Sequence, residues 1–201
     1  MNQIKLYFLT GFLGSGKTTL ANILAKFYEI PTGKIFFNDI DINDIERKSF
    51  YEKFAYVMQD DYIYDNTIKH NIELYKNYEK NEVKEATKKA ELFDTIEKLD
   101  KKYDTLIGDN GIKLSGGQKQ RLILSRNLIT NPNILIIDNG FTGLDIDTRK
   151  KVIDNLNNRN NKATLVIISS MMEDIKNADK IYKLENKTLV EINMEEEVYD
   201  A

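Results

Sequence analysis

The feature that most constrains the fold is a glycine-rich run at residues 11–18, Gly-Phe-Leu-Gly-Ser-Gly-Lys-Thr. It fits the P-loop pattern G-x-x-x-x-G-K-[ST] and lies between a strand-like segment (4–9) and a helix-like segment (18–28). Small residues let successive backbone N–H groups wrap phosphate oxygens, and the following helix adds its positive end. Lys17 is expected to reach the β- and γ-phosphates of a nucleotide, and the Thr18 hydroxyl is expected to bind Mg²⁺.

Apolar strand-like segments alternate with helix-like segments along the rest of the chain. Strands are expected at 34–37, 54–58, 134–138, 164–168 and 180–184, and helices at 82–99, 117–129 and 147–156. This alternation predicts an α/β fold, a P-loop NTPase with a mainly parallel sheet covered by helices and ligands at the carboxyl ends of the strands. The length of 201 residues fits a single domain, with a core at 1–75 and 130–195 and a helical sub-domain at about 76–129.

The composition excludes several classes of site. The chain has no Cys and one His, which rules out Cys-ligated zinc, thiolate nucleophiles and a metal site built from histidines. The net charge of −3 gives no broad positive surface, so no nucleic-acid partner is expected. The longest apolar runs are four residues, and no secretory signal precedes the first strand, so a cytoplasmic location without a membrane span is expected.

A second motif, Leu114-Ser115-Gly116-Gly117-Gln118, lies directly before an expected helix. Ser115 and the two glycines are suited to a second anion site at a helix N-terminus. A purely structural explanation is that Ser115 caps its helix. This explanation accounts neither for Gln118 nor for the presence of a P-loop in the same chain. With this motif the chain resembles the ATP-binding cassette (ABC) ATPases, whose signature motif is LSGGQ.

The resemblance implies ligands and partners. It implies ATP and Mg²⁺ as cofactors, and a second ABC ATPase chain, identical or different, paired head to tail so that each P-loop faces the partner's signature motif. It also implies a separate transmembrane permease, which would place this chain at the cytoplasmic face of a membrane. The residues implied to hold the nucleotide are Gly11, Phe12, Leu13, Gly14, Ser15, Gly16, Lys17, Thr18, Thr19, Ser115, Gly116, Gly117 and Gln118.

Further segments match the family's pattern. Asp138 ends a strand that is similar to the Walker B strand, and Gln59 matches the Q-loop glutamine. With Thr18, these two residues are the implied Mg²⁺ ligands. Residues 143–145 resemble the D-loop that crosses the dimer interface, and residues 105–111 resemble a segment that is typical of exporters.

Three departures from the pattern predict altered activity. Asn139 replaces the usual Glu that polarises the attacking water, and Ser170 replaces the switch His; with Gln59 these are the candidate catalytic residues. Ten residues precede Gly11, so the two antiparallel strands and the adenine-stacking aromatic residue that the family places upstream are expected to be missing. The chain is thus expected to be a transport ATPase that binds ATP and hydrolyses it slowly at its own P-loop. Its intact signature motif is expected to complete the nucleotide site of a partner chain.

One alternative function stays open, and two others have less support from the sequence. The runner-up is a regulatory or dimerisation module that binds ATP without significant turnover. Residues 10–14 also resemble the metal-chaperone GTPases, but the chain lacks their Cys-rich motif. A nucleotide kinase would contain the P-loop, but this function gives no reason for the LSGGQ motif. Residues 62–64 (Tyr-Ile-Tyr) are a candidate surface for the permease, with buried packing as the alternative, and His70 is read as an ordinary surface residue.

Overall fold

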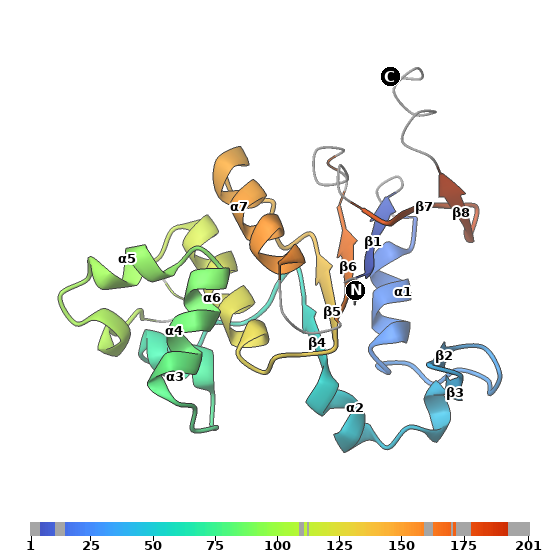
Figure 1. Cartoon of the computed structure of the whole chain (residues 1–201), viewed down its shortest axis with the longest axis horizontal. Helices are drawn as coiled ribbons and strands as arrows, with labels where there is room; N and C mark the ends of the chain where they lie inside the picture. Colours follow the sequence, from blue (N-terminus) through green and yellow to red (C-terminus); the bar gives the residue numbers. More distant parts are fainter. Residues whose placement is uncertain are drawn as a thin grey trace. The chain divides into compact units, whose positions relative to one another are not determined.

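The computed structural model describes residues 5–10, 15–108, 111, 113–158, 163–169, 171 and 178–192. The chain forms two compact units (Figure 1), which are described separately. The first unit comprises Met1–Tyr56, Pro132–Asp138 and Lys162–Ala201, and the second comprises Val57–Asn131 and Asn139–Asn161. Each unit is therefore assembled from segments that are far apart in the sequence. The prediction of one domain with a helical sub-domain at about 76–129 stays a prediction.

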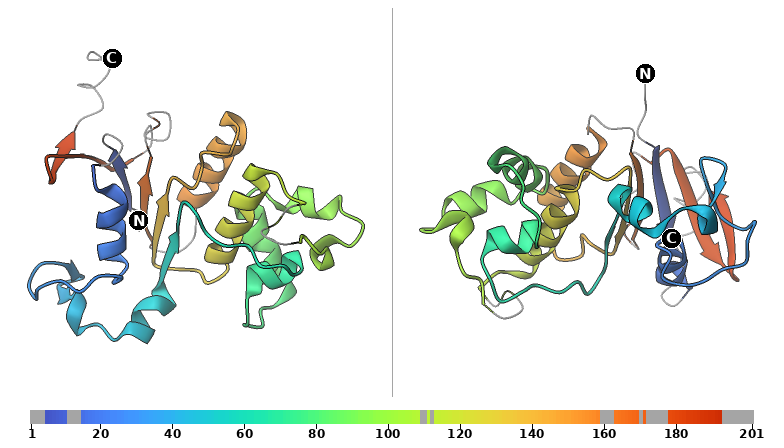
Figure 2. Two further views of the ribbon diagram at one scale, coloured as in Figure 1. Left: turned by 180° about the vertical axis from the view of Figure 1, so that it is seen from behind. Right: turned by 90° about the horizontal axis from the view of Figure 1, so that it is seen from below.

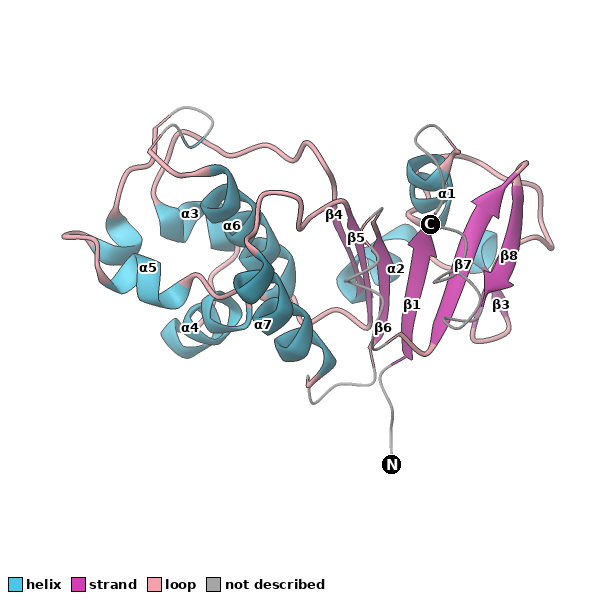
Figure 3. Cartoon of the chain, turned by 90° about the horizontal axis from the view of Figure 1, so that it is seen from above, coloured by secondary structure: helices cyan, strands magenta, loops and turns pink. Residues whose placement is uncertain are grey.

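The first unit is built on a six-stranded sheet with the strand order β4-β5-β6-β1-β7-β8 (Figure 3). The strands are β1 (Lys5–Thr10), β4 (Phe54–Val57), β5 (Ile134–Asp138), β6 (Thr164–Ile168), β7 (Lys180–Glu185) and β8 (Thr188–Ile192). β1 pairs in parallel with β6 and β7, and β5 pairs in parallel with β6. Leu9 and Asp138 are both in register with Ile168, so β1 and β5 end at the same edge of the sheet. The predicted α/β fold with a mainly parallel sheet is confirmed.

Two helices pack on the sheet of the first unit, α1 (Lys17–Leu24) and α2 (Arg47–Lys53). Figure 2 shows α1 beside β1. A buried cluster joins the two helices to the sheet; its members are Ala21, Ala25, Phe50, Phe54, Tyr56, Ile136, Ile168 and Leu184. On β5, Leu135 and Ile137 alternate with Ile136 and are also buried. β5 is thus buried on both faces, as is typical of a central parallel strand. The unit also contains β2 (Phe36–Phe37), β3 (Ile40–Asp41) and the short helix η1 (Ile42–Asp44).

Helix α1 ends four residues before the predicted end at residue 28. The cause is Lys26, whose backbone takes the left-handed conformation (φ 59°). Its ammonium group donates hydrogen bonds to the carbonyl oxygens of Ile42 (2.6 Å) and Ile45 (2.7 Å). Two hydrogen bonds from one charged donor hold a turn that the local sequence does not favour.

The second unit is helical. Its elements are α3 (Ile68–Glu73), α4 (Lys80–Lys89), α5 (Phe93–Glu97), η2 (Lys102–Asp104), α6 (Gly116–Leu128) and α7 (Ile146–Asn157). α6 contacts both α3 and α4, and α4 also contacts α7. Leu122 on α6 is fully buried. Helices α6 and α7 lie within one residue of the predicted bounds.

The single helix predicted over 82–99 is wrong, because α4 ends at Lys89 and α5 begins at Phe93. Glu91 lies between them with a left-handed backbone (φ 55°). Two other helices hold this break: the Arg121 guanidinium donates to the Glu91 carbonyl oxygen, and the Asn155 side-chain amide donates to the Glu91 carboxylate (2.7 Å). The sequence has no glycine or proline here, so the break depends on tertiary contacts.

Strand β8 is absent from the sequence-based prediction. It follows β7 through a hairpin whose two connecting residues, Asn186 and Lys187, both have positive φ (47° and 64°). Turns of this kind usually contain glycine. The Asn-Lys pair therefore gave only a weak indication of a hairpin.

Candidate functional site

The N-terminus of α1 lies where the P-loop motif ends. Gly16 directly precedes the helix with φ 99° and ψ 13°, a left-handed conformation that residues with a Cβ atom rarely adopt. A Cβ atom at Gly16 would have room, since the nearest atom would be Leu184 Cδ2 at 3.8 Å. The backbone conformation, and not lack of space, therefore requires glycine here. Five predicted nucleotide-binding residues lie at this helix start: Ser15, Gly16, Lys17, Thr18 and Thr19.

The Lys17 ammonium group is partly withdrawn from water. It donates a hydrogen bond to the Ser15 hydroxyl over 3.3 Å. Burial lowers the pKa of Lys17, and the negative charge of Asp138 opposes this shift. Positive charge in such a position interacts with a phosphate more strongly than a fully hydrated lysine does.

Asp138, at the end of β5, is fully buried and accepts a hydrogen bond from the Tyr56 hydroxyl (3.3 Å). Burial raises the pKa of Tyr56, and the Asp138 charge raises it further, so the hydroxyl stays protonated and donates. Tyr56 thereby restrains the carboxylate. Sequence reasoning did not select Tyr56, because the contact joins residues that are 82 positions apart.

Thr18 and Asp138 provide one hydroxyl and one carboxylate in the first unit. Mg²⁺ that enters with a nucleotide takes one or two such protein ligands and completes its shell with phosphates and water. Within the described ranges, no group of three or more His, Cys, Asp or Glu residues could hold a metal ion. A hydroxyl and a carboxylate are the kinds of protein ligand that nucleotide-bound Mg²⁺ takes.

The second predicted anion site begins α6. The Ser115 hydroxyl accepts from the backbone N–H of Gln118 (3.3 Å), and the Gln118 side-chain oxygen accepts from the backbone N–H of Ser115 (3.0 Å). These reciprocal bonds form a capping box. Helix capping therefore does account for Gln118, contrary to expectation, because Gln118 completes the box. The N–H groups of Gly116 and Gly117, in the first turn, have no acceptor within the helix and remain suited to a phosphate.

Residues 142–143 pack closely on the start of α6. The Gln120 side chain accepts from the backbone N–H of Gly143 (2.8 Å) and donates to the Thr142 hydroxyl (3.0 Å). A Cβ atom at Gly117 would lie 2.6 Å from the carbonyl oxygen of Gly143. The start of α6 and residues 142–143 are thus held together, and the close approach of the Gly143 carbonyl requires glycine at 117. Sequence reasoning did not select Gln120.

Replacing Gly117 with alanine should lower the free energy of unfolding by about 1–3 kcal/mol, because the new methyl group overlaps the Gly143 carbonyl. The matched control is Gly116→Ala, whose Cβ atom meets no atom within 4 Å and should leave stability unchanged or slightly raised. Urea denaturation followed by circular dichroism measures both changes. Equal stability of the two variants would contradict the close packing.

Asn139 and Gln59 contact each other in the second unit. The Asn139 side-chain amide donates to the Gln59 side-chain oxygen over 3.2 Å. Asn139 has a left-handed backbone (φ 50°), which asparagine adopts more readily than glutamate. The structure therefore brings together two of the three candidate catalytic residues.

Several predicted residues lie outside the described residues. They are Ser170, the third candidate catalytic residue, and the first half of the P-loop, Gly11, Phe12, Leu13 and Gly14. Two members of the exporter-like segment, Asp109 and Asn110, are also outside.

The Tyr-Ile-Tyr segment divides between the surface and the core. Ile63 is buried, whereas Tyr62 and Tyr64 are exposed, and their rings meet edge to face with centroids 5.2 Å apart. The Arg126 guanidinium lies 5.5 Å from the centre of the Tyr64 ring and donates to the Tyr62 carbonyl oxygen (2.8 Å). His70 packs against Tyr64 with centroids 6.4 Å apart. Buried packing therefore holds for Ile63, and the role of the two exposed tyrosines as a contact surface for the permease stays a prediction.

Comparison with known proteins identifies a matching family and several similar chains. The family model described as ABC transporter matches residues 1–142. The β-(1→2)glucan export ATP-binding/permease protein NdvA of Bartonella bacilliformis is 39% identical over 184 residues, which cover 91% of this chain and 31% of that protein. The ATP-dependent lipid A-core flippase of Photorhabdus laumondii is 34% identical over 189 residues, 93% of this chain and 32% of the flippase.

A solved structure is also similar, that of a bacterial Atm1-family ABC exporter with ATP bound. It superposes with a TM-score of 0.86 and 32% identity, covering 92% of this chain and 33% of the exporter chain. The chain thus spans about a third of the length of these relatives. Among the helices that the structure describes, none is both long and apolar enough to cross a membrane. The chain belongs to the ABC transporter family, in which it is an ATP-binding domain of the exporter type.

Proposed function

We propose that this chain binds Mg²⁺-ATP in a head-to-tail pair of cassettes and so drives a membrane permease. In this arrangement each nucleotide lies between the P-loop of one chain and the signature motif of the other. The observation that carries the proposal is the presence of two helix N-termini suited to phosphate, that of α1 with Lys17 and that of α6 with Ser115, in separate compact units.

The first unit would bind the nucleotide phosphates. The α1 N-terminus and the partly desolvated Lys17 ammonium would hold the β- and γ-phosphates. Thr18 and the buried Asp138, restrained by Tyr56, would hold Mg²⁺, which neutralises charge on the phosphates when it is bound. Gln59 is proposed as a further contact to the metal or to water.

The second unit would supply the other half of the partner's site. Ser115 and the first-turn N–H groups of Gly116 and Gly117 would meet the γ-phosphate bound to the partner's P-loop. ATP would then bind the closed pair more tightly than the open pair, which is the physical requirement for a ligand that shifts a conformational equilibrium. The hydrogen bonds between Gln120 and residues 142–143 would couple movements of the signature motif to those of the D-loop.

Hydrolysis at this chain's own P-loop is proposed to be slow. The side chain of Asn139 is a neutral amide that orients water and accepts no proton from it. One of its two amide hydrogens is donated to Gln59. Ser170, at the switch position, carries a short hydroxyl in place of an imidazole. The alternative function is an ATP-gated module without significant turnover, and the same replacements favour it.

The permease is proposed to be a separate chain that places this one at the cytoplasmic face of a membrane. The relative named an ATP-binding/permease protein suggests the alternative that both parts belong to one polypeptide. The exposed rings of Tyr62 and Tyr64, held by Arg126, are the proposed contact surface.

Co-purification with a membrane partner, followed by phosphate-release assays with and without it, tests the proposal. We expect slow release from the chain alone and faster release in the complex. Release that stays at background in the complex would favour the ATP-gated module. Vigorous release from the unaltered chain alone would contradict slow turnover.

A further inference from the structure

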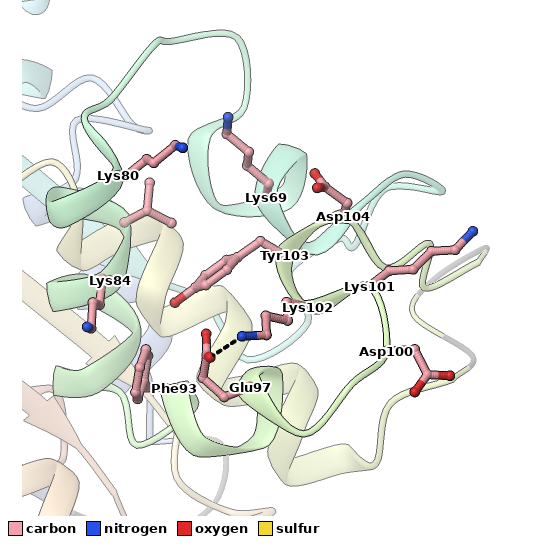
Figure 4. Close-up of a pocket in the computed structure, with 11 residues that line it drawn as sticks. Lys69, Lys80, Lys84, Phe93, Glu97, Asp100, Lys101, Lys102, Tyr103 and Asp104 are labelled. Atoms are coloured by element: carbon pink, nitrogen blue, oxygen red, sulfur yellow. Dashed lines mark hydrogen bonds and ion pairs between the residues drawn. The ribbon is translucent and has the colours of Figure 1, made fainter.

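The second unit contains a cavity of about 750 Å³ that none of the nucleotide-binding residues lines. It lies between α4, α5, η2 and the start of α3 (Figure 4). Its size falls within the range of small-molecule sites, about 300–1,000 Å³. The apolar part of its wall consists of Val83, Phe93 and Tyr103.

The aromatic wall is held in place by hydrogen bonds. The Tyr103 hydroxyl lies 2.8 Å from the hydroxyl of the buried Thr87. Thr87 donates its own proton to the Lys84 carbonyl oxygen (2.9 Å), so Tyr103 is the donor in the first bond. The Tyr103 ring is thereby fixed to α4, and it needs little ordering when a ligand binds.

Five of the residues that line the cavity are lysines and three are acidic, so the wall carries a net positive charge. Lys69, Lys80 and Lys84 line it from two helices, and the Lys84 ammonium group lies 5.1 Å from the centre of the Phe93 ring. Within the described residues, neither Lys80 nor Lys84 has an ion pair. Lys69 lies 3.9 Å from the Glu73 carboxylate.

The three acidic residues offset only part of the positive charge of the wall. Glu97 is paired with Lys102 over 2.7 Å. Asp100 lies at the far end, where Figure 4 shows its side chain directed away from Tyr103. Asp104 is at the rim near Lys69.

We propose that this cavity binds a small aromatic anion, whose ring packs against Phe93 and Tyr103 and whose carboxylate meets a lysine ammonium group of the wall. Aromatic walls favour a planar ring, and a wall with more lysines than acidic residues favours a negative group on the ligand. The inference does not depend on the proposed nucleotide chemistry.

The test is titration of the full chain with 2-naphthoate, measured by calorimetry at low ionic strength. Saturable binding at one site is expected. It should weaken about tenfold in the double variant Lys80→Gln, Lys84→Gln, and it should be unchanged in Lys150→Gln, Lys151→Gln, which removes the same charge from exposed positions on α7.

Two further ligands test the contribution of the negative group and that of the aromatic ring separately. The neutral 2-naphthalenemethanol and the non-aromatic cyclohexanecarboxylate should each bind more weakly than 2-naphthoate. No saturable binding of 2-naphthoate, equal loss in both double variants, or equal binding of the neutral compound would overturn the proposal. Thermal melting of each variant shows that a loss of binding is not a loss of fold.

Discussion

Replacing Asn139 with glutamate is expected to raise the rate of ATP hydrolysis by about 10²- to 10⁴-fold, the usual contribution of a general base. A carboxylate at position 139 accepts the proton of the attacking water, which the amide cannot do. It also has no amide hydrogen to donate to Gln59, so the contact of 3.2 Å is lost or reversed. Steady-state phosphate release at saturating Mg²⁺-ATP measures the effect.

The matched control is Asn139→Gln, which has nearly the length of glutamate and no basic oxygen. It should stay at the rate of the unaltered chain. Because residue 139 has φ 50°, either longer side chain should cost about 1 kcal/mol of stability, and both variants should melt slightly earlier. If glutamate gives no gain by itself, adding Ser170→His tests whether the missing switch residue limits the rate. No gain in the double variant would contradict the assignment of these positions.

Replacing Lys17 with alanine is expected to weaken Mg²⁺-ATP binding by about 10²-fold or more. The variant removes a partly buried positive charge that would contact the β- and γ-phosphates. Equilibrium binding of a fluorescent ATP analogue at fixed ionic strength measures the loss. The control is Lys34→Ala, an exposed lysine in the same unit, which should leave the affinity unchanged. Similar losses of affinity in the two variants would show a general effect of charge and would contradict a specific contact between Lys17 and the phosphates.

The sequence predicted the parts of the fold that local patterns determine. The P-loop motif predicts a strand, a loop and a helix, and β1 and α1 occupy those positions. Continuous apolar runs predict buried parallel strands, which β5 and β6 are. At the start of α6 the pattern Ser-x-x-Gln also contains a capping box, and that indication was available before the structure.

Contacts between distant residues could not be predicted in this way. The break at Glu91 depends on Arg121 and Asn155, which lie on other helices. The bond from Tyr56 to Asp138 and the packing of Gly143 on Gly117 depend on the tertiary fold as well. In each case the local residues permit more than one conformation, and a partner remote in sequence selects between them.

In the proposed function, the P-loop and the signature motif complete one nucleotide site only when they come from different chains. Two variants disable one half each: Lys17→Ala removes the phosphate-binding lysine, and Gly116→Glu places a negative charge in the signature motif at a position with open space for a side chain. In a mixture of the two, one site of each mixed pair combines an intact P-loop with an intact signature motif.

Sedimentation velocity of each variant alone and of the mixture, with and without Mg²⁺-ATP, measures whether this site forms. We predict that ATP produces dimers of the unaltered chain and of the mixture, and leaves each variant alone monomeric. A mixture that stays monomeric while the unaltered chain dimerises with ATP would contradict the claim.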